Sequence, residues 1–207
     1  MKKLFLFSGT QLLAACAALC ADADLQTRVE QLEKRLGALE KSIQPLVEKA
    51  DAEAQTRERV EKHHAEAVRR AQLDSAKYSQ EALKEIESLY QVANRQWRSE
   101  EGKASLRKLV ETYKEANRTG CAVLYLGQMT QGEESEAFLR RAIDQFSDCY
   151  YFDGVQVGAY ARLVLGQYYQ AKGESKKAAD LFQEIRDKYG DAVDHNGKPL
   201  VASLPSA

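Results

Sequence analysis

Apolar residues recur along most of the chain at spacings of three and four residues, which is the period of an α-helix. The two-residue alternation of a half-buried β-strand is hard to find in any segment. The pattern therefore predicts an all-α protein. Along the chain it predicts a narrow apolar stripe in residues 24–46, a charged stretch in residues 47–77 and a series of short amphipathic helices in residues 78–190.

The most regular pattern is a heptad repeat in residues 24–46, which predicts a coiled coil. Arg28 and Arg35 fall at the g positions of this repeat. Glu33 and Glu40 fall at the e positions of the following heptads, the spacing that pairs opposite charges across a parallel homo-oligomer. An amphipathic helix packed on its own domain is the alternative, but the narrow stripe and the complementary charges favour self-association into a dimer or trimer. The a and d positions of the repeat are Leu25, Val29, Leu32, Leu36, Leu39, Ile43 and Leu46.

Pro45 ends the heptad pattern, because proline lacks the N–H that bonds back one helical turn. Residues 47–77 are rich in Ala, Glu, Arg and Lys, which predicts an exposed helical stalk. His63 and His64 within it suggest a metal site. Adjacent helical residues point about 100° apart, however, and cannot bind one ion together, so a solvated helix face is the prediction.

Residues 78–190 read as a tetratricopeptide-like helical domain, in which glycine-containing turns separate amphipathic segments. The apolar stripes predict three helical hairpins, with a loop in residues 147–158 between the second and the third. A C-terminal tail follows in residues 191–207.

The third hairpin carries the residue-specific signal, because its Leu-Gly pair, turn glycine and aromatic residues have the spacing of the tetratricopeptide repeat. Glycine and alanine let two helices approach closely, and the aromatic rings fill the groove between them. A partial copy begins 39 residues earlier, longer than the repeat's usual period of about 34 residues. The signature consists of Leu126, Gly127 and Ala137 in the partial copy, and of Leu165, Gly166, Tyr169, Gly173, Ala178 and Phe182 in the full one.

The N-terminus has the order of a secretory signal: a basic start, an apolar run and small residues before an acidic segment. The run is shorter than the roughly 20 apolar residues that span a bilayer. Cleavage after Ala23 would remove residues 1–23. The sequence Leu-Ala-Ala-Cys at residues 13–16 instead resembles a lipobox, in which residues 1–15 are removed and Cys16 is lipidated, which leaves a lipid anchor as the membrane contact. Either ending predicts export to the periplasm or the outer membrane of a bacterium.

Charge and cysteine content narrow the partners. The net charge is −1 and the pI about 6.4, so the chain lacks the positive charge typical of nucleic-acid-binding proteins. No cofactor is expected either. Export places Cys121 and Cys149 in an oxidising compartment, where they are predicted to form a disulfide across the middle hairpin. Two independent buried thiols are the alternative.

An enzymatic function is the weaker interpretation. The candidate region is residues 148–160, in which residues 150–153 form an aromatic and acidic loop. Asp153, Asp194 and His195 are the candidate catalytic or metal-binding residues. The H-E-x-x-H, G-x-S-x-G and Gly-rich phosphate motifs are absent, so the chain is predicted not to be an enzyme. An envelope enzyme or metal-binding protein that uses this region stays as the alternative.

The export signal, the short coiled coil and the repeat-like hairpins together resemble the CpoB (YbgF) family of periplasmic proteins. The resemblance is architectural over residues 25–189 and residue-specific only over residues 165–182. It implies a trimerising coiled coil and an adaptor that links envelope machinery to cell division. The chain departs from that family in its fewer clear repeats, its longer charged stalk and its lipobox-like sequence. The lipobox and repeats also resemble repeat-bearing outer-membrane assembly lipoproteins. The expected function is that of a self-associating adaptor for envelope proteins.

Overall fold

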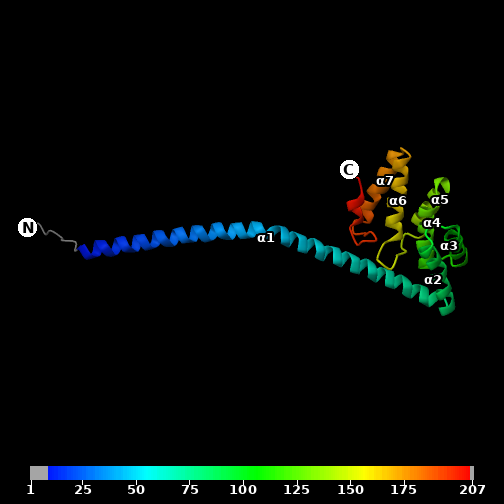
Figure 1. The fold of residues 1–207 in the computed structure, drawn as a ribbon, viewed down its shortest axis with the longest axis horizontal. Coiled ribbons are helices and arrows are strands. Elements are labelled where there is room, and N and C mark those ends of the chain that lie inside the picture. The colour runs from blue at the N-terminus through cyan, green and yellow to red at the C-terminus, as the bar shows by residue number, and fades with distance from the viewer. Residues whose placement is uncertain (1–8, 206–207) are drawn as a thin grey trace, which may run out of the picture. The chain divides into compact units, whose positions relative to one another are not determined.

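The computed structural model describes the backbone of residues 9–205 and the side chains of residues 25–205. The predicted signal peptide and the predicted lipidation site Cys16 fall outside the side chains that the structure describes. The prediction of an all-α protein is confirmed, since no β-strand forms among the described residues beyond two isolated bridges. The elements are α1 (Gly9–Lys77), α2 (Gln80–Arg95), α3 (Glu100–Thr112), α4 (Asn117–Met129), α5 (Gly132–Gln145), α6 (Val157–Ala171), α7 (Ser175–Lys188) and the 3-10 helix η1 (Leu200–Ser203) (Figure 1).

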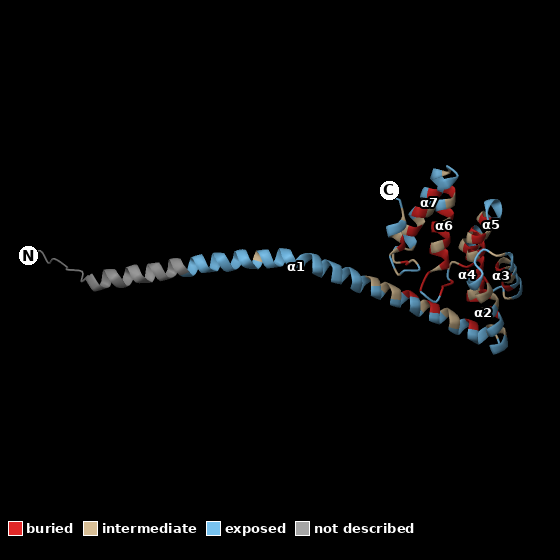
Figure 2. Ribbon diagram, viewed as in Figure 1, coloured by how far each residue is buried: buried red, intermediate tan, exposed pale blue. Residues whose placement is uncertain are grey.

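The chain divides into two units, residues 1–53 and residues 54–207. In the first unit the helix continues through Pro45, so the proline does not interrupt the backbone helix. Proline costs a helix about 3 kcal/mol, and the strong helix formers on both sides continue the helix across it. The side chains from Leu25 to Leu46 along the heptad stripe are exposed in this unit, by 50 to 66% (Figure 2).

The second unit begins at Ala54 and includes the last turns of α1, where the prediction of an exposed stalk is wrong. One face of this stretch is buried at helical spacing: His63 is 4% exposed, Ala67 is 0% and Asp74 is 9%. The prediction that His63 lies on a solvated face is therefore also wrong. The hydrophobic pattern of the sequence does not reveal this buried face, because it consists of alanine and polar side chains rather than large apolar ones.

Three helical hairpins build the rest of the second unit, as the sequence predicts. Helix α2 packs on α3, α4 on α5, and α6 on α7, and each hairpin packs on the next through α3 with α4 and α5 with α6. Helix α4 also contacts both α2 and α6, so the first helices of the hairpins are neighbours along one side (Figure 1). Residues 191–205, part of the segment predicted as a tail, pack on this core through the buried Ala192 and Leu200.

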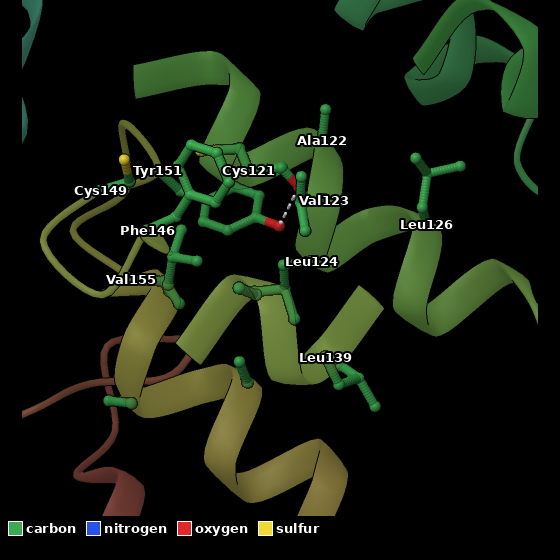
Figure 3. Packing of buried hydrophobic residues seen from close by; sticks show 14 of the residues in the cluster. Cys121, Ala122, Val123, Leu124, Leu126, Leu139, Phe146, Cys149, Tyr151 and Val155 are labelled. Atoms are coloured by element: carbon green, nitrogen blue, oxygen red, sulfur yellow. Dashed lines mark hydrogen bonds between the residues drawn. The ribbon is translucent and has the colours of Figure 1, made fainter. Parts of the chain in front are cut away.

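Helix ends and core follow from local chemistry. Ser79 and Ser99 cap α2 and α3 by accepting hydrogen bonds from the backbone N–H groups of residues three positions further on. The apolar face of α4 packs against α5 and the loop before α6 (Figure 3). The large side chains with the least exposure in this core include Leu106, Leu109, Leu124, Leu126, Leu139, Leu165 and Ile185.

The signature glycines lie where helices touch. A Cβ at Gly127 would lie 2.8 Å from Cγ of Leu139 on α5, and one at Gly166 would lie 2.9 Å from Cζ of Phe182 on α7. Gly173 forms the turn between α6 and α7 with a positive φ of 79°, which glycine adopts without the penalty of a Cβ. The close approach inferred for Gly166 and Phe182 is therefore present.

Gly166→Ala is expected to destabilise the second unit, because the added methyl group must displace the buried Phe182 ring. Overpacking of this kind costs about 1–3 kcal/mol. Urea unfolding followed by circular dichroism measures the change in the free energy of unfolding. The control is Gly37→Ala, since nothing lies within 4 Å of a Cβ at Gly37, and it is expected to leave the unfolding of the second unit unchanged. Equal unfolding midpoints for both variants would contradict this account of the helix contact.

Candidate functional site

A cavity of about 550 Å³ lies on the side of the second unit formed by the first helices of the hairpins. Helices α2, α4 and α6, the loop before α6 and the C-terminal segment all contribute to it. We call it the aromatic cleft, because six of its eleven lining side chains are aromatic: Tyr90, Trp97, Tyr125, Tyr151, Phe152 and Tyr160. The other lining residues are Asn94, Arg118, Gln128, Asp153 and His195.

Helical spacing places several of these side chains on one face. Tyr90, Asn94 and Trp97 follow one another at intervals of four and three, the last just beyond the end of α2. On α4, Arg118 and Tyr125 are seven residues apart and share a face in the same way. Both helices direct these residues to the same cavity, so the cleft follows from their packing.

Three of the rings, those of Tyr90, Tyr125 and Trp97, contact one another. The centroids of Trp97 and Tyr125 are 4.7 Å apart, and Tyr90 stacks on Tyr125 with a separation of 5.8 Å. Trp97 is 44% exposed and Phe152 50% exposed, although both are large apolar side chains. Exposed aromatic rings grouped in a concave site are characteristic of ligand-binding surfaces.

Arg118 is the cation at the base of the cleft, and its side chain is 11% exposed. Its guanidinium lies 4.5 Å from the ring centroid of Tyr90 and 4.3 Å from that of Phe152. Two hydrogen bonds, of 2.8 and 3.2 Å, join it to the Glu87 carboxylate. The charge of Arg118 is therefore paired within the protein, and its stacking holds Phe152 over the cleft.

The structure brings together two of the three residues predicted for an enzymatic site. Nδ1 of His195 donates a hydrogen bond of 2.7 Å to the Asp153 carboxylate, and the His195 ring meets the rings of Tyr151 and Tyr160 edge-on. Asp194 has another role, since its carboxylate accepts hydrogen bonds from the backbone N–H groups of Asn196 and Lys198. These bonds close the turn that holds His195.

The Asp153 carboxylate is held in its charged form. Burial works to raise its pKa, but the hydrogen bond and charge of His195, with a backbone N–H, outweigh burial and lower the pKa below its usual value. Among the side chains that the structure describes, no three His, Cys, Asp or Glu residues are grouped to bind a metal ion. The arrangement can orient a ligand through rings and polar groups.

The predicted disulfide is not formed, and Cys121 and Cys149 are both free and buried (Figure 3). The Cys121 thiol donates to the carbonyl of Tyr150, whereas Arg70 donates to the sulfur of Cys149 at 3.6 Å. Burial raises the pKa of Cys149 to about 12, which keeps its thiol protonated. The alternative that the sequence left open, two thiols acting as small core residues, describes this structure.

The loop of the cleft depends on contacts that the sequence did not suggest. The Asn117 side chain donates to the carbonyl of Tyr150 at 2.7 Å and accepts from the backbone N–H of Tyr150 at 2.8 Å. His64 on α1 donates to the carbonyl of Phe152 at 2.9 Å. These bonds fix the backbone on either side of Tyr151.

Sequence reasoning missed the cleft itself. Tyr90 and Trp97 lie on the apolar stripe of the first hairpin, a pattern typical of core positions, and Tyr125 lies in the nearly continuous apolar run of α4. Tyr90 is indeed buried, whereas Trp97 is 44% exposed. Only Trp97 at the end of its stripe, beside Arg98, offered a signal that the stripe reaches the surface.

Comparison with family models, with curated proteins and with solved structures finds no match to this chain. Within the described residues, no helix contains a stretch long and apolar enough to cross a membrane.

Asp153→Asn is expected to lower the free energy of unfolding by about 0.2–1 kcal/mol near pH 5.5, because the ion pair with His195 is half exposed. The pKa of Asp153 is lower in the folded than in the unfolded state, so its contribution is full above the unfolded value of about 3.9. It is lost as the pH falls through the folded value. Denaturant unfolding across this range should therefore show the two proteins converge in acid.

Asp180→Asn is the control for this series, since Asp180 is an exposed carboxylate of α7 outside the cleft. A difference between wild type and Asp153→Asn that stays constant down to strong acid would contradict the ion-pair account.

Proposed function

We propose that this chain is an exported, self-associating adaptor that binds segments of other envelope proteins in the aromatic cleft. The observation that carries the proposal is the cleft, where the rings of Trp97 and Phe152 are 44% and 50% exposed although the adjoining core buries its large apolar side chains. A protein that keeps such rings at its surface uses them for binding.

The architecture of the second unit supports an adaptor. We assign the three hairpins to a tetratricopeptide-like array, in which the first helices line a binding surface and the second helices cover them. The contacts of Gly166 with Phe182 and of Gly127 with Leu139 agree with this assignment. In this proposal the cleft occupies the surface that the first helices share.

The exposed heptad stripe supports self-association. Seven large apolar side chains at a and d positions are each at least half exposed in the single chain. Covering them with a second or third copy removes this apolar surface from water, at about 1.5–3 kcal/mol for each side chain fully buried. The charges at g and e, with Arg28 followed by Glu33 and Arg35 followed by Glu40, suit a parallel arrangement of copies.

A photo-crosslinking amino acid tests the binding role when it replaces Gln128, which lines the cleft. We expect crosslinks from this position to a small set of envelope proteins after illumination of cells. The control position is Gln183, an exposed residue on α7 outside the cleft, where these products should be missing. Identical products from both positions, or none from Gln128, would refute the cleft as the binding surface.

Leu32→Asp combined with Leu36→Asp is expected to convert the oligomer to a monomer, because each substitution places a charge in the shared seam. Light scattering at micromolar concentration measures the mass. The control is Lys34→Asp, which adds the same side chain at the outward f position and should keep the oligomer. A monomeric wild-type chain would contradict the seam, and it would leave the crosslinking test of the cleft standing.

A further inference from the structure

The charged groups of the aromatic cleft are already paired with one another or with neighbouring groups. Arg118 is joined to Glu87, and Asp153 is joined to His195. No other lining residue of the cleft is charged or titrates near neutral pH. A charged ligand would have to break one of these pairs to gain a partner, so the cleft favours an uncharged ligand.

The lining chemistry also separates two kinds of peptide. An amphipathic helix binds through aliphatic anchors that enter apolar pockets. The aromatic cleft has no Leu, Ile, Val or Met in its lining and offers flat rings instead. Flat aromatic rings in a groove suit an extended segment whose proline rings pack against them. Aromatic-lined grooves bind polyproline II helices in this way.

The shape of the surface agrees with an extended ligand. A second cavity, of about 440 Å³, shares Trp97, Gln128 and Tyr160 with the aromatic cleft and continues to Gln167 and Tyr168. Its lining also includes Leu139, Val164 and Arg98, whose guanidinium lies 5.5 Å from the centroid of the Trp97 ring. The groove therefore runs along α4 and α6 past several rings. Gln128 and Gln167 each bring amide N–H groups that can donate to peptide carbonyls, which in a polyproline II helix have no internal partner.

We infer that the aromatic cleft binds an uncharged, proline-rich segment of a partner protein in the polyproline II conformation. Each proline ring packs on an aromatic ring, and the glutamine amides hydrogen bond to the carbonyls between them. A segment that is already extended loses little conformational entropy on binding, so a shallow groove with few anchors suffices. The inference rests on the proposed function and names the class of segment that the adaptor recognises.

The test uses the full chain and Trp97, the single tryptophan of the sequence, as a fluorescent reporter inside the cleft. The probe is a capped polyproline peptide of about ten residues. Matched probes of equal length are a Gly/Ser peptide, a Lys-rich peptide and a Glu-rich peptide, together with a neutral oligosaccharide. We expect a saturable change of Trp97 emission with polyproline, at a lower concentration than with any other probe.

Variants locate the binding to the rings. Tyr125→Ala and Phe152→Ala should each weaken polyproline binding by about 3- to 10-fold, the range of a single aromatic contact. Tyr125→Phe keeps the ring and should retain the affinity. Tyr113→Ala removes a ring outside the cleft and should have no effect. Phe152 is half exposed, so its variant tests the site even where Tyr125→Ala disturbs folding, which circular dichroism reports.

The outcomes separate this inference from the proposed function. A stronger response to a charged peptide, to the Gly/Ser peptide or to the oligosaccharide overturns the proline-rich class, as does the lack of a saturable response to polyproline. If crosslinks from Gln128 to partner proteins persist in that case, the adaptor role stands and only the ligand class is wrong. If those crosslinks are missing as well, both proposals fail.

Discussion

The buried amide of Asn117 is the contact on which the second unit depends. Its side-chain amide donates to the carbonyl of Tyr150 and accepts from the backbone N–H of Tyr150. The backbone N–H of Asn117 donates to the Asp74 carboxylate of α1 at 2.8 Å. Three segments far apart in the sequence therefore meet at one residue: the end of α1, the start of α4 and the loop before α6. Each of these polar groups is buried, so the loss of one partner would leave another unsatisfied.

The cleft follows from this constraint. Two residues after Tyr150, the Phe152 ring lies against the guanidinium of Arg118, 4.3 Å from it. Helix α1 also holds this loop through His64. The loop forms one wall of the cleft, and these hydrogen bonds together with the Arg118 contact orient its exposed Phe152 ring. Preorganisation of this kind lowers the entropy that binding costs.

The sequence predicts what is local and periodic. The stripes of the three hairpins and the turn at Gly173 were visible because each lies within one helical pattern, and the contact of Gly166 with Phe182 follows a known spacing. The docking of α1 was not visible, since its buried face consists of His63, Ala67 and Asp74, which carry no apolar signal.

The cleft was missed because its parts come from α2, α4, a loop and the C-terminal segment, and because its rings follow the same spacing as core positions. The cysteines were close enough in the predicted hairpin to suggest a bridge, but the direction of each thiol depends on contacts with Arg70 and Tyr150 that spacing does not encode.

The two proposed surfaces depend on each other energetically. A groove that holds a peptide by a few rings and amides offers modest affinity, because each aromatic contact contributes only about 0.5–1.5 kcal/mol. Self-association through the heptad stripe would place two or three such clefts on one particle. A partner with repeated proline-rich segments would then bind its second segment at an effective concentration near millimolar, which multiplies the affinity without any new contact. A narrow seam and a shallow cleft are each weak alone, and their combination explains why one short chain would carry both.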